Sequence, residues 1–458
     1  MDRLDAPGPL QKLPATARSL LTRGLWVFCT VLLAGVVFAE CRAEPASGGR
    51  PLAGVAERPA GNDSPGGAWP GFRGPRRDGL ARWLPESLDR AKILWKKRLT
   101  GAGLAGLAAT TGRVIVADRD PFDLDDVFRC LDAHNGTPLW KLQYPAPGDL
   151  DYGNSPRATP LVVDGNVYLL GAFGDLHCVG LDDGKLIWKT NLVHRFGAKL
   201  VTWGMCSSPL VVDGKLIVNP GAPDASLAAL DPATGKLLWQ TPGEPAAYAS
   251  FIVGTFGGRR QIVGYDAISL GGWDPATGKR LWQLLPPEEG DFNVPTPVDA
   301  GGKLLVTTEN NGTRLYEFDP NGTIRPTPVA SNRDLAPDTI TPLVVDGKVF
   351  GCWGDLFCLD SDRLETLWTG RDRAFEDHVS ILGAPGRILI STCRGELFLV
   401  GTGGSGYELI SRFPVFGDDS EVYSHPALVG TRLYLRDGTT VCCVELGPGA
   451  PPRQEASR

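Results

Sequence analysis

Short apolar runs interrupted by an Asp-Gly pair recur along the chain and indicate its secondary structure. Clear examples are "TPLVVDGNVYLL" (159–170), "SPLVVDGKLIV" (208–218) and "TPLVVDGKVF" (341–350). An Asp-Gly pair flanked by β-branched residues is the strongest short-range signal for a β-hairpin with a two-residue turn. Each of these runs therefore predicts two short antiparallel strands.

A second hairpin follows the first. The stretch "GDLFCLD" (354–360) alternates apolar and polar positions, then meets a polar turn and a short strand containing Trp368. Two copies of this turn and strand are nearly identical, "LDPATGKLLWQ" (230–240) and "WDPATGKRLWQ" (273–283). Together the two hairpins predict a unit of four short strands.

The acidic residue that opens this turn marks a repeat, because it recurs at intervals of 41 to 50 residues. Weaker copies place Gly401 and Glu445 at the same position. Eight such units fill roughly residues 105–446, a periodicity typical of propeller blades. The sequence therefore predicts an all-β fold, an eight-bladed β-propeller of four-stranded antiparallel blades. The markers of the clear copies are Asp132, Asp182, Asp231, Asp274, Asp319 and Asp360.

The eighth unit ends at Glu445 without its last strand, and a strand without a unit lies near the N-terminus. This is "AKILWKKRL" (91–99), whose Trp95 precedes Trp140 by one repeat length. A strand from the start of the chain would satisfy edge groups that an open last sheet would expose. We therefore expect residues 92–98 to lie beside residues 432–446.

The repeated turn has an architectural explanation. We expect the marker carboxylate to accept main-chain hydrogen bonds in its own turn, and glycines such as Gly235 and Gly278 to adopt a positive φ. The tryptophan that follows is expected to pack between neighbouring blades. The tryptophans expected to do so are Trp95, Trp140, Trp188, Trp239, Trp282 and Trp368.

The segments outside the repeats indicate where the protein resides. Basic residues precede an uncharged run from Gly24 to Ala39, and small residues follow around Ala43, an order typical of a secretory signal peptide. We expect this segment to be cleaved or retained as a membrane anchor, and the chain to be periplasmic or otherwise extracytoplasmic. The expected organisation is a signal peptide or anchor over 1–43, a disordered linker over 44–68, a lead-in over 69–91, the propeller over 92–446 and a disordered tail over 447–458.

Composition agrees with this fold and excludes one class of partner. The 458 residues include 58 Gly and 38 Pro, which favours many turns, and 42% hydrophobic residues, enough for a large core. The net charge is −6 with no basic patch, so the electrostatic footprint of a nucleic-acid-binding protein is missing.

The stretch "ALDPATGKLLW" (229–239) resembles the tryptophan-docking motif of the pyrroloquinoline-quinone (PQQ)-like repeat. This repeat builds eight-bladed quinoprotein dehydrogenases and also the cofactor-free outer-membrane assembly lipoprotein of the Bam complex. The resemblance spans about residues 92–446 and implies the fold rather than one activity. The stretch "WPGFRGPRRDGLA" (69–81) resembles the lead-in of secreted bacterial propellers, where we expect Trp69 and Phe72 to cover one end of the ring.

The resemblance to dehydrogenases would imply a Ca²⁺ site, a catalytic Asp, an aromatic floor and a vicinal disulfide over the quinone. A vicinal pair is present, Cys442-Cys443, but it falls in the last blade, whereas those enzymes carry theirs in an early blade loop. Cys443, Cys130 and Cys358 lie two residues before their markers, as Ala229 does, which favours small buried side chains. No set of Ca²⁺ ligands matches and no cysteine or histidine spacing indicates a metal.

The remaining candidate site is the mouth of the ring, formed by segments that enter the innermost strands. A funnel of carboxylates, histidines and aromatic rings could bind a cation or a small polar ligand. Its candidate residues are Asp151, Arg157, Trp203, Asp291, Asp338, Asp377, His378, Glu421, Tyr423 and His425.

These patterns predict a non-catalytic, monomeric scaffold that binds envelope or outer-membrane proteins without a cofactor, a metal or nucleic acid. It would meet the membrane only through an uncleaved N-terminal segment. Two alternatives stay open: an oxidoreductase that uses PQQ and Ca²⁺, and a propeller that binds a small ligand or sugar without turnover.

Overall fold

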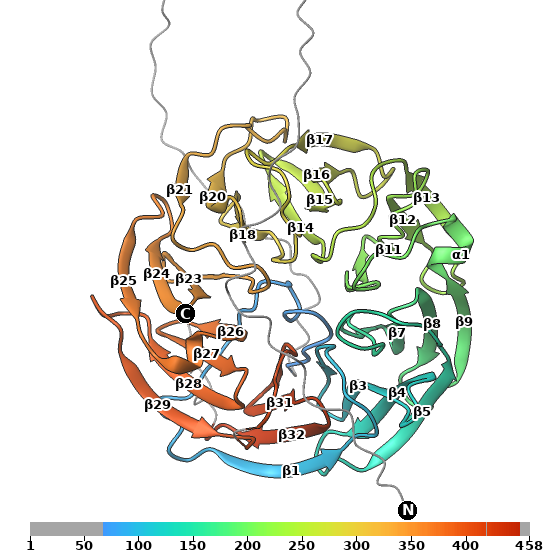
Figure 1. The fold of residues 1–458 in the computed structure, drawn as a ribbon, viewed down its shortest axis with the longest axis horizontal. Helices are drawn as coiled ribbons and strands as arrows, with labels where there is room; N and C mark the ends of the chain where they lie inside the picture. The colour runs from blue at the N-terminus through green and yellow to red at the C-terminus, as the bar shows by residue number, and fades with distance from the viewer. Residues whose placement is uncertain (1–66, 418, 449–458) are drawn as a thin grey trace, which may run out of the picture. The chain divides into compact units, whose positions relative to one another are not determined.

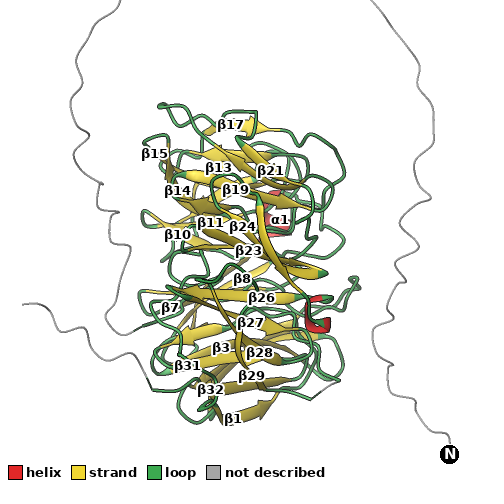
Figure 2. Ribbon diagram, turned by 90° about the vertical axis from the view of Figure 1, so that its left-hand side faces the viewer, coloured by secondary structure: helices red, strands yellow, loops and turns green. Residues whose placement is uncertain are grey.

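The chain forms a ring of eight antiparallel sheets. Figure 1 views the ring face-on and Figure 2 views it from the side. We call the space surrounded by the innermost strands the channel. The structure is a computed structural model, and residues 67–417 and 419–448 are described. Every sheet has four strands. The predicted all-β, eight-bladed propeller is therefore confirmed.

Blades 1 to 4 are each made of four consecutive strands, ordered from the channel outwards. Blade 1 contains β2 (Ala108–Ala109), β3 (Arg113–Arg119), β4 (Asp125–Asp132) and β5 (Pro138–Pro145). Blade 2 contains β6 (Leu161–Val163), β7 (Asn166–Leu170), β8 (Asp175–Gly180) and β9 (Leu186–Asn191). Blade 3 contains β10 (Leu210–Val212), β11 (Lys215–Val218), β12 (Leu227–Leu230) and β13 (Leu237–Thr241). Blade 4 contains β14 (Ile252–Phe256), β15 (Arg259–Tyr265), β16 (Leu270–Trp273) and β17 (Arg280–Leu284).

Blades 5 to 7 repeat this order. Blade 5 contains β18 (Val298–Ala300), β19 (Lys303–Thr308), β20 (Gly312–Tyr316) and β21 (Ala330–Asn332). Blade 6 contains β22 (Leu343–Val345), β23 (Lys348–Trp353), β24 (Asp355–Asp360) and β25 (Thr366–Gly370). Blade 7 contains β26 (Val379–Ala384), β27 (Arg387–Thr392), β28 (Glu396–Gly401) and β29 (Leu409–Pro414). Two short helices, α1 (Leu192–Phe196) and the 3₁₀ helix η2 (Arg373–Phe375), lie in connections between blades.

Blade 8 joins the two ends of the described chain. Its inner strands are β30 (Ala427–Val429), β31 (Arg432–Arg436) and β32 (Thr440–Glu445), and its outermost strand is β1 (Lys92–Arg98). The strands β1 and β32 are antiparallel, with Lys92 opposite Glu445 and Arg98 opposite Thr440. The predicted closure of the last blade by an N-terminal strand is confirmed, and Figure 1 shows β1 at the outer edge of that blade.

The first hairpins of blades 2, 3 and 6 turn as their Asp-Gly pairs predict. Asp213 and Gly214 have φ values of 48° and 70°, and Asp346 and Gly347 have values of 52° and 70°. Two consecutive positive φ angles define the turn whose twist matches that of antiparallel strands.

The second hairpin connects neighbouring blades. In blade 3 the carboxylate of Asp231 accepts a hydrogen bond of 2.8 Å from the main-chain nitrogen of Thr234, which holds the turn. The indole nitrogen of Trp188, in blade 2, donates to the main-chain oxygen of Pro232 in that turn at 2.8 Å. Equivalent bonds join Trp95 to Ala133, Trp140 to Leu181 and Trp239 to Pro275. These four tryptophans therefore link consecutive blades from blade 8 to blade 4.

Two other tryptophans of the repeat are held differently. The indole nitrogen of Trp282 donates to the side-chain oxygen of Gln261 at 2.6 Å, and the amide nitrogen of Gln261 donates to Gly322 of blade 5. Among the described residues, the indole nitrogen of Trp368 has no hydrogen-bond partner, although its ring is buried. Blades 4 and 5 are therefore linked through the side-chain amide of Gln261, whereas Trp368 contributes through the packing of its ring.

One marker was placed incorrectly. The turn of blade 2 closes through a hydrogen bond from the main-chain nitrogen of Gly184 to the oxygen of Gly180, the bond that Gly136 makes to Asp132 in blade 1. Gly180 therefore occupies the marker position, and Asp182 lies two residues beyond it. The Asp182 carboxylate instead accepts a bond from Arg113 at 2.8 Å. The doubled Asp in "GLDDGK" hid this register, which also places Cys178 opposite Trp188.

The lead-in runs through the channel rather than across one end. Trp69 pairs with Ala109 on the innermost strand of blade 1, and Leu80 pairs with Gly383 on that of blade 7. Between them the main-chain nitrogen of Val162 in blade 2 donates to Pro70 at 2.7 Å. The lead-in therefore plugs the ring, and in Figure 1 this blue segment crosses the centre.

Several expectations about the ends of the chain lie outside the described residues. These are the signal peptide or anchor over 1–43, nearly all of the linker and most of the C-terminal tail. No helix within residues 67–417 and 419–448 combines the length and apolar character that crossing a membrane requires.

Candidate functional site

The connections that enter the innermost strands lie on one face of the ring, because the four strands of every blade alternate in direction. We call this face the mouth. Hydroxyl groups link the connections at the entrance to the channel: the main-chain nitrogen of Thr159 donates to the hydroxyl of Ser208, and that of Ser208 donates to Ser250, each at 3.0 Å. The series continues from Ser250 to Thr296 and on to Thr341. Ser or Thr before the innermost strand thus fastens one blade to the next.

The tip of the lead-in closes the channel at the level of these hydroxyl groups. Arg73 donates to the main-chain oxygens of Thr341 and Pro342 in blade 6, at 3.2 and 2.9 Å. Arg77 donates to Pro209 and Ser208 in blade 3, at 2.8 and 3.1 Å. Their guanidinium groups are buried, which lowers the pKa of Arg73 to about 10 and that of Arg77 to about 9. The two side chains therefore fasten the lead-in to two blades that are not neighbours.

Sequence reasoning did not anticipate these arginines. Arg77 also lies over the ring of Phe72, with its central carbon 5.3 Å from the ring centroid. The ring of Phe72 meets His425 edge-on at 4.9 Å. Phe72, Arg73 and Arg77 thus form the floor of the mouth. The residues "FRGPRR" gave no functional signal, because nothing in a sequence tells a buried arginine from an exposed one.

On one side of the mouth, aromatic rings from four connections gather around Trp203. Its ring centroid lies 4.5 Å from that of Tyr248, 5.0 Å from that of Phe292 and 6.3 Å from that of Tyr152. Trp203 was predicted as a candidate, whereas Tyr152, Tyr248 and Phe292 were not. For Tyr152 and Phe292 the available signal was their position next to the candidates Asp151 and Asp291, and Tyr248 had no such signal.

On the other side, histidine and carboxylate side chains gather. The Nδ1 atom of His378 lies 3.5 Å from the hydroxyl of Thr339, and its ring lies 5.7 Å from that of Tyr423. Burial lowers the pKa of His378 to about 4, and burial, together with the nearby charge of Arg73, lowers the pKa of His425 well below 6.5. Both rings are therefore neutral at pH 7.

The charged candidates have structural partners that limit their availability. Arg157 donates to the main-chain oxygens of Asp151 and Gly153, at 2.8 and 2.6 Å, and so ties its own loop. Asp291 accepts from the main-chain nitrogen of Asn310 at 2.9 Å and from the amide of Asn311 at 2.6 Å.

The other carboxylate candidates lie around the histidine side of the mouth. Asp377 lies 3.6 Å from Arg394, and Asp338 accepts from Thr339 at 3.2 Å. Glu421 is half-buried and lies close enough to Tyr423 to raise the pKa of that phenol, after the larger effect of burial. The predicted residues therefore form two groups at the mouth rather than one converging set.

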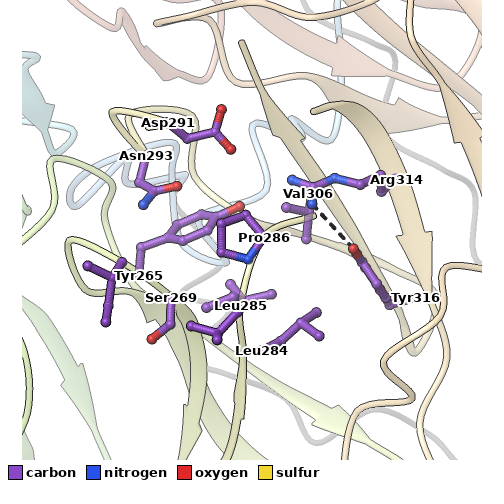
Figure 3. Close-up of a pocket in the computed structure, with 12 residues that line it drawn as sticks. Tyr265, Ser269, Leu284, Leu285, Pro286, Asp291, Asn293, Val306, Arg314 and Tyr316 are labelled. Carbon is purple, nitrogen blue, oxygen red and sulfur yellow. Dashed lines mark hydrogen bonds between the residues drawn. The ribbon is translucent and has the colours of Figure 1, made fainter. Parts of the chain in front are cut away.

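A small pocket opens between blades 4 and 5 (Figure 3). Its empty volume, open entrance included, is about 270 Å³, but its enclosed part has room for roughly one water molecule. Tyr265 and Arg314 line it, and the Tyr265 hydroxyl and the Nε atom of Arg314 are buried without a partner among the described residues. Asp291 lies at its polar end. The pocket as it stands is too small for a ligand much larger than a water molecule.

The described residues do not fit the quinone site that the resemblance implied. Cys442 and Cys443 are buried free thiols in β32, and Cys443 lies opposite Trp95 on the outermost strand. Consecutive residues of a strand face opposite sides of the sheet, so the pair does not lie over the channel. Residues 146–160, the first connection at the mouth, contain no cysteine. Within the described part of the chain, no three potential ligands from His, Cys, Asp and Glu gather as a metal site.

The eight four-stranded blades and the tryptophan links define the class of protein, an eight-bladed propeller of PQQ-like repeats. A family model described as outer membrane protein assembly factor BamB matches residues 87–192 and 125–370, together more than half of the chain. The chain therefore belongs to the BamB family of propellers.

Solved structures agree with this fold. The crystal structure of BamB from Moraxella catarrhalis has a TM-score of 0.56 at 15% identity, and the match covers 78% of this chain and 99% of that one. The quinohemoprotein alcohol dehydrogenase of Comamonas testosteroni has a TM-score of 0.59 at 13% identity, covering 84% and 81%.

The curated proteins with similar sequences are alcohol dehydrogenases. The quinohemoprotein alcohol dehydrogenase ADH-IIG of Pseudomonas putida is 29% identical over 229 residues, which are 42% of this chain and 30% of that protein. A quinone-dependent alcohol dehydrogenase subunit of Gluconacetobacter polyoxogenes is 27% identical over 176 residues, 23% of its length. The matches thus span less than a third of these relatives.

Proposed function

We propose that this protein is a non-catalytic, monomeric scaffold of the cell envelope that binds other envelope proteins and uses no cofactor. Membership of the BamB family, whose description names outer-membrane assembly, supports the envelope and the binding role. The class of partner is thus a protein of the envelope or outer membrane.

The observation that carries the proposal is that the lead-in, which we call the plug, fills the centre of the ring. The chain's own lead-in fills the channel up to the mouth, and Arg73 and Arg77 fasten it to blades 6 and 3. A braced plug turns the ring into a rigid body with a broad mouth, which suits recognition between surfaces. The vicinal cysteines lie away from the mouth, which supports binding without quinone chemistry.

An oxidoreductase that uses PQQ and Ca²⁺ is the second candidate, because the curated relatives are quinone-dependent alcohol dehydrogenases. Titration of the purified protein with PQQ and Ca²⁺, followed by dye-linked oxidation of primary alcohols, separates the two functions. The scaffold proposal expects neither saturable PQQ binding nor dye reduction above a heat-denatured control. Tight binding accompanied by turnover would overturn it.

A further inference from the structure

Two connections build a fixed corner on the mouth at blades 1 and 2. The main-chain nitrogen of Ala146 donates to Leu124 at 2.9 Å, and the amide of Asn154 donates to the Asp123 carboxylate at 2.6 Å. Arg119 donates to the main-chain oxygens of both Asp123 and Ala146 at 2.8 Å. The hairpin between β3 and β4 and the segment after β5 are thus joined as one unit.

This fixed corner holds apolar side chains in the solvent. Phe122 is 80% exposed, Leu124 is 56% exposed and Tyr152 is 59% exposed. The Asp120 carboxylate accepts from the main-chain nitrogens of Phe122 and Leu124, at 2.9 and 2.6 Å, so the tip cannot turn these side chains inward without breaking hydrogen bonds. Apolar groups kept exposed by a rigid frame indicate an interaction site.

The backbone of the corner is also strained. Asp123 and Tyr152 have φ values of 57° and 65°, a region that side chains other than glycine rarely adopt. Such strain persists only where the surrounding contacts impose it, and it clusters at functional sites.

The corner continues into the aromatic group at Trp203. Tyr152 contacts Trp203, and Trp203 contacts Phe292, which is 53% exposed and belongs to the connection between blades 4 and 5. An apolar strip therefore crosses the mouth from blade 1 to blade 5. We call this strip and the carboxylates beside it the acidic-aromatic ridge, made of Phe122, Leu124, Asp149, Asp151, Tyr152, Trp203 and Phe292.

The carboxylates beside the strip form no ion pair with the described residues. Asp149 and Asp151 are exposed, and no Lys, Arg or His of the described chain lies within ion-pair distance of either carboxylate. The guanidinium group of the nearby Arg157 donates to main-chain oxygens of its own loop rather than to these carboxylates. Exposed aromatic faces next to free carboxylates are complementary to arginine and lysine, which gain both cation–π contact and charge pairing.

We propose that the acidic-aromatic ridge docks a basic segment of a partner protein, with its Arg or Lys side chains over Tyr152, Trp203 and Phe292 and its apolar side chains against Phe122 and Leu124. This inference rests on the proposed scaffold function and names the surface and the chemistry of the partner. Exposed carboxylates without an ion-pair partner disfavour an acidic segment and an anionic lipid surface alike.

Photo-crosslinking in the native host tests the surface. A benzoylphenylalanine replaces Phe122 or Tyr152 in the full chain, with Leu238 on the outer strand of blade 3 as the control position, since its side chain is 47% exposed. The proposal expects crosslinks at 122 and 152 to one protein segment of net positive charge. Crosslinks to lipid, or to acidic segments, would overturn it.

The same experiment separates this inference from the scaffold function. Partners captured at position 238 but none at 122 or 152 would overturn the ridge and leave the scaffold standing. The absence of partners at all three positions would count against the scaffold itself.

Calorimetric titration of the purified protein with two peptides tests the chemistry. The probes are an eight-residue peptide that alternates Arg and Leu, and its counterpart that alternates Glu and Leu. We expect only the Arg peptide to bind, with a weaker affinity at 0.5 M salt. The variant Phe122→Ser/Tyr152→Ser should reduce its affinity at least tenfold, and Asp149→Asn/Asp151→Asn should flatten the salt dependence.

Leu238→Ser is the matched control and should leave the affinity unchanged. Equal binding of both peptides, no binding of the Arg peptide at millimolar concentration, or the same affinity in the ridge variants would each overturn the proposal. Circular dichroism of each variant verifies that the fold is retained.

Discussion

The indole nitrogen of Trp188 donates a 2.8 Å hydrogen bond to the main-chain oxygen of Pro232, in the turn of the following blade. The same ring lies against Gly235 of that turn, where an added Cβ would come within 2.7 Å of the indole. Gly235 therefore serves twice: its φ of 68° forms the turn, and its missing side chain makes room for the tryptophan. Gly136, Gly184 and Gly278 have the same relationship to Trp95, Trp140 and Trp239.

The first prediction compares two glycines that share a backbone conformation. Gly214 has a φ of 70°, and a Cβ added there would meet nothing within 4 Å. Gly214→Ala should therefore lower the free energy of unfolding by only about 1 kcal/mol, the cost of a positive φ for alanine. Gly235→Ala adds a clash with Trp188 and should cost about 1–3 kcal/mol more. Urea unfolding of both variants measures the difference, and equal losses would show that the indole does not require this glycine.

The second prediction concerns the indole hydrogen bond. Trp188→Phe keeps an aromatic ring in the seam but leaves the Pro232 oxygen without its donor, whereas the indole nitrogen of Trp368 has no partner to lose among the described residues. Trp188→Phe should therefore destabilise the fold by about 1 kcal/mol more than Trp368→Phe. Chemical denaturation provides the comparison, and a larger loss for Trp368→Phe would contradict it.

The repeat made the blades predictable because its units share local signals. Asp-Gly specifies the first turn of blades 2, 3 and 6, Asp and Gly specify the second turn of several blades, and Trp lies on the outermost strand of six blades. Together with the unpaired N-terminal strand, these signals were enough to predict the ring. Asp182 was misassigned because the other clear turns open with an acidic residue, whereas the turn of blade 2 has Gly180 at that position. The hydrogen bond from Gly184 to Gly180 fixes the register, and it is visible only in the structure.

The mouth was less predictable because its connections differ in every blade. Trp203 and the histidines could be placed there from their position before the innermost strands. Arg73 and Arg77 could not, since the bonds that fasten them to the blades go to main-chain oxygens more than 130 residues away, and such bonds leave no trace in the local sequence.

The third prediction tests how the plug is braced. The two terminal nitrogens of the planar Arg77 guanidinium donate to the main-chain oxygens of Pro209 and Ser208. Lysine carries the same charge into the same buried place but cannot form this fork, so Arg77→Lys should cost about 2–4 kcal/mol. Arg77→Met removes the buried charge along with the bonds and should cost less.

The matched control is Arg76→Lys, at a neighbouring side chain that is 52% exposed, and it should change little. The midpoint of urea unfolding ranks the three variants. If Arg77→Met proves more destabilising than Arg77→Lys, the charge rather than the forked geometry holds the plug.

The fourth prediction follows from a buried histidine outside the mouth. His177 on β8 is 3% exposed and stacks on Tyr144 at 4.2 Å, and its Nδ1 atom has no partner among the described residues. Burial lowers its pKa from 6.5 to about 4, with Lys189 contributing in the same direction. Between those pH values the unfolded chain binds a proton that the folded chain does not bind. Stability present above pH 6.5 is therefore lost as the pH falls towards 4, by up to about 3 kcal/mol for this residue.

The variant His177→Gln stays neutral at every pH and should remove this part of the pH dependence. The free energy of unfolding, measured by urea denaturation at pH 7.5 and at about pH 4, should differ less in the variant than in the wild type by roughly 2–3 kcal/mol. His134→Gln, in an exposed turn, controls for the removal of a histidine. The prediction fails if the difference in unfolding free energy between the two pH values is the same in His177→Gln as in the wild type. That result would mean that His177 binds its proton equally well in the folded and unfolded chain, because water reaches the ring despite the packing of Tyr144.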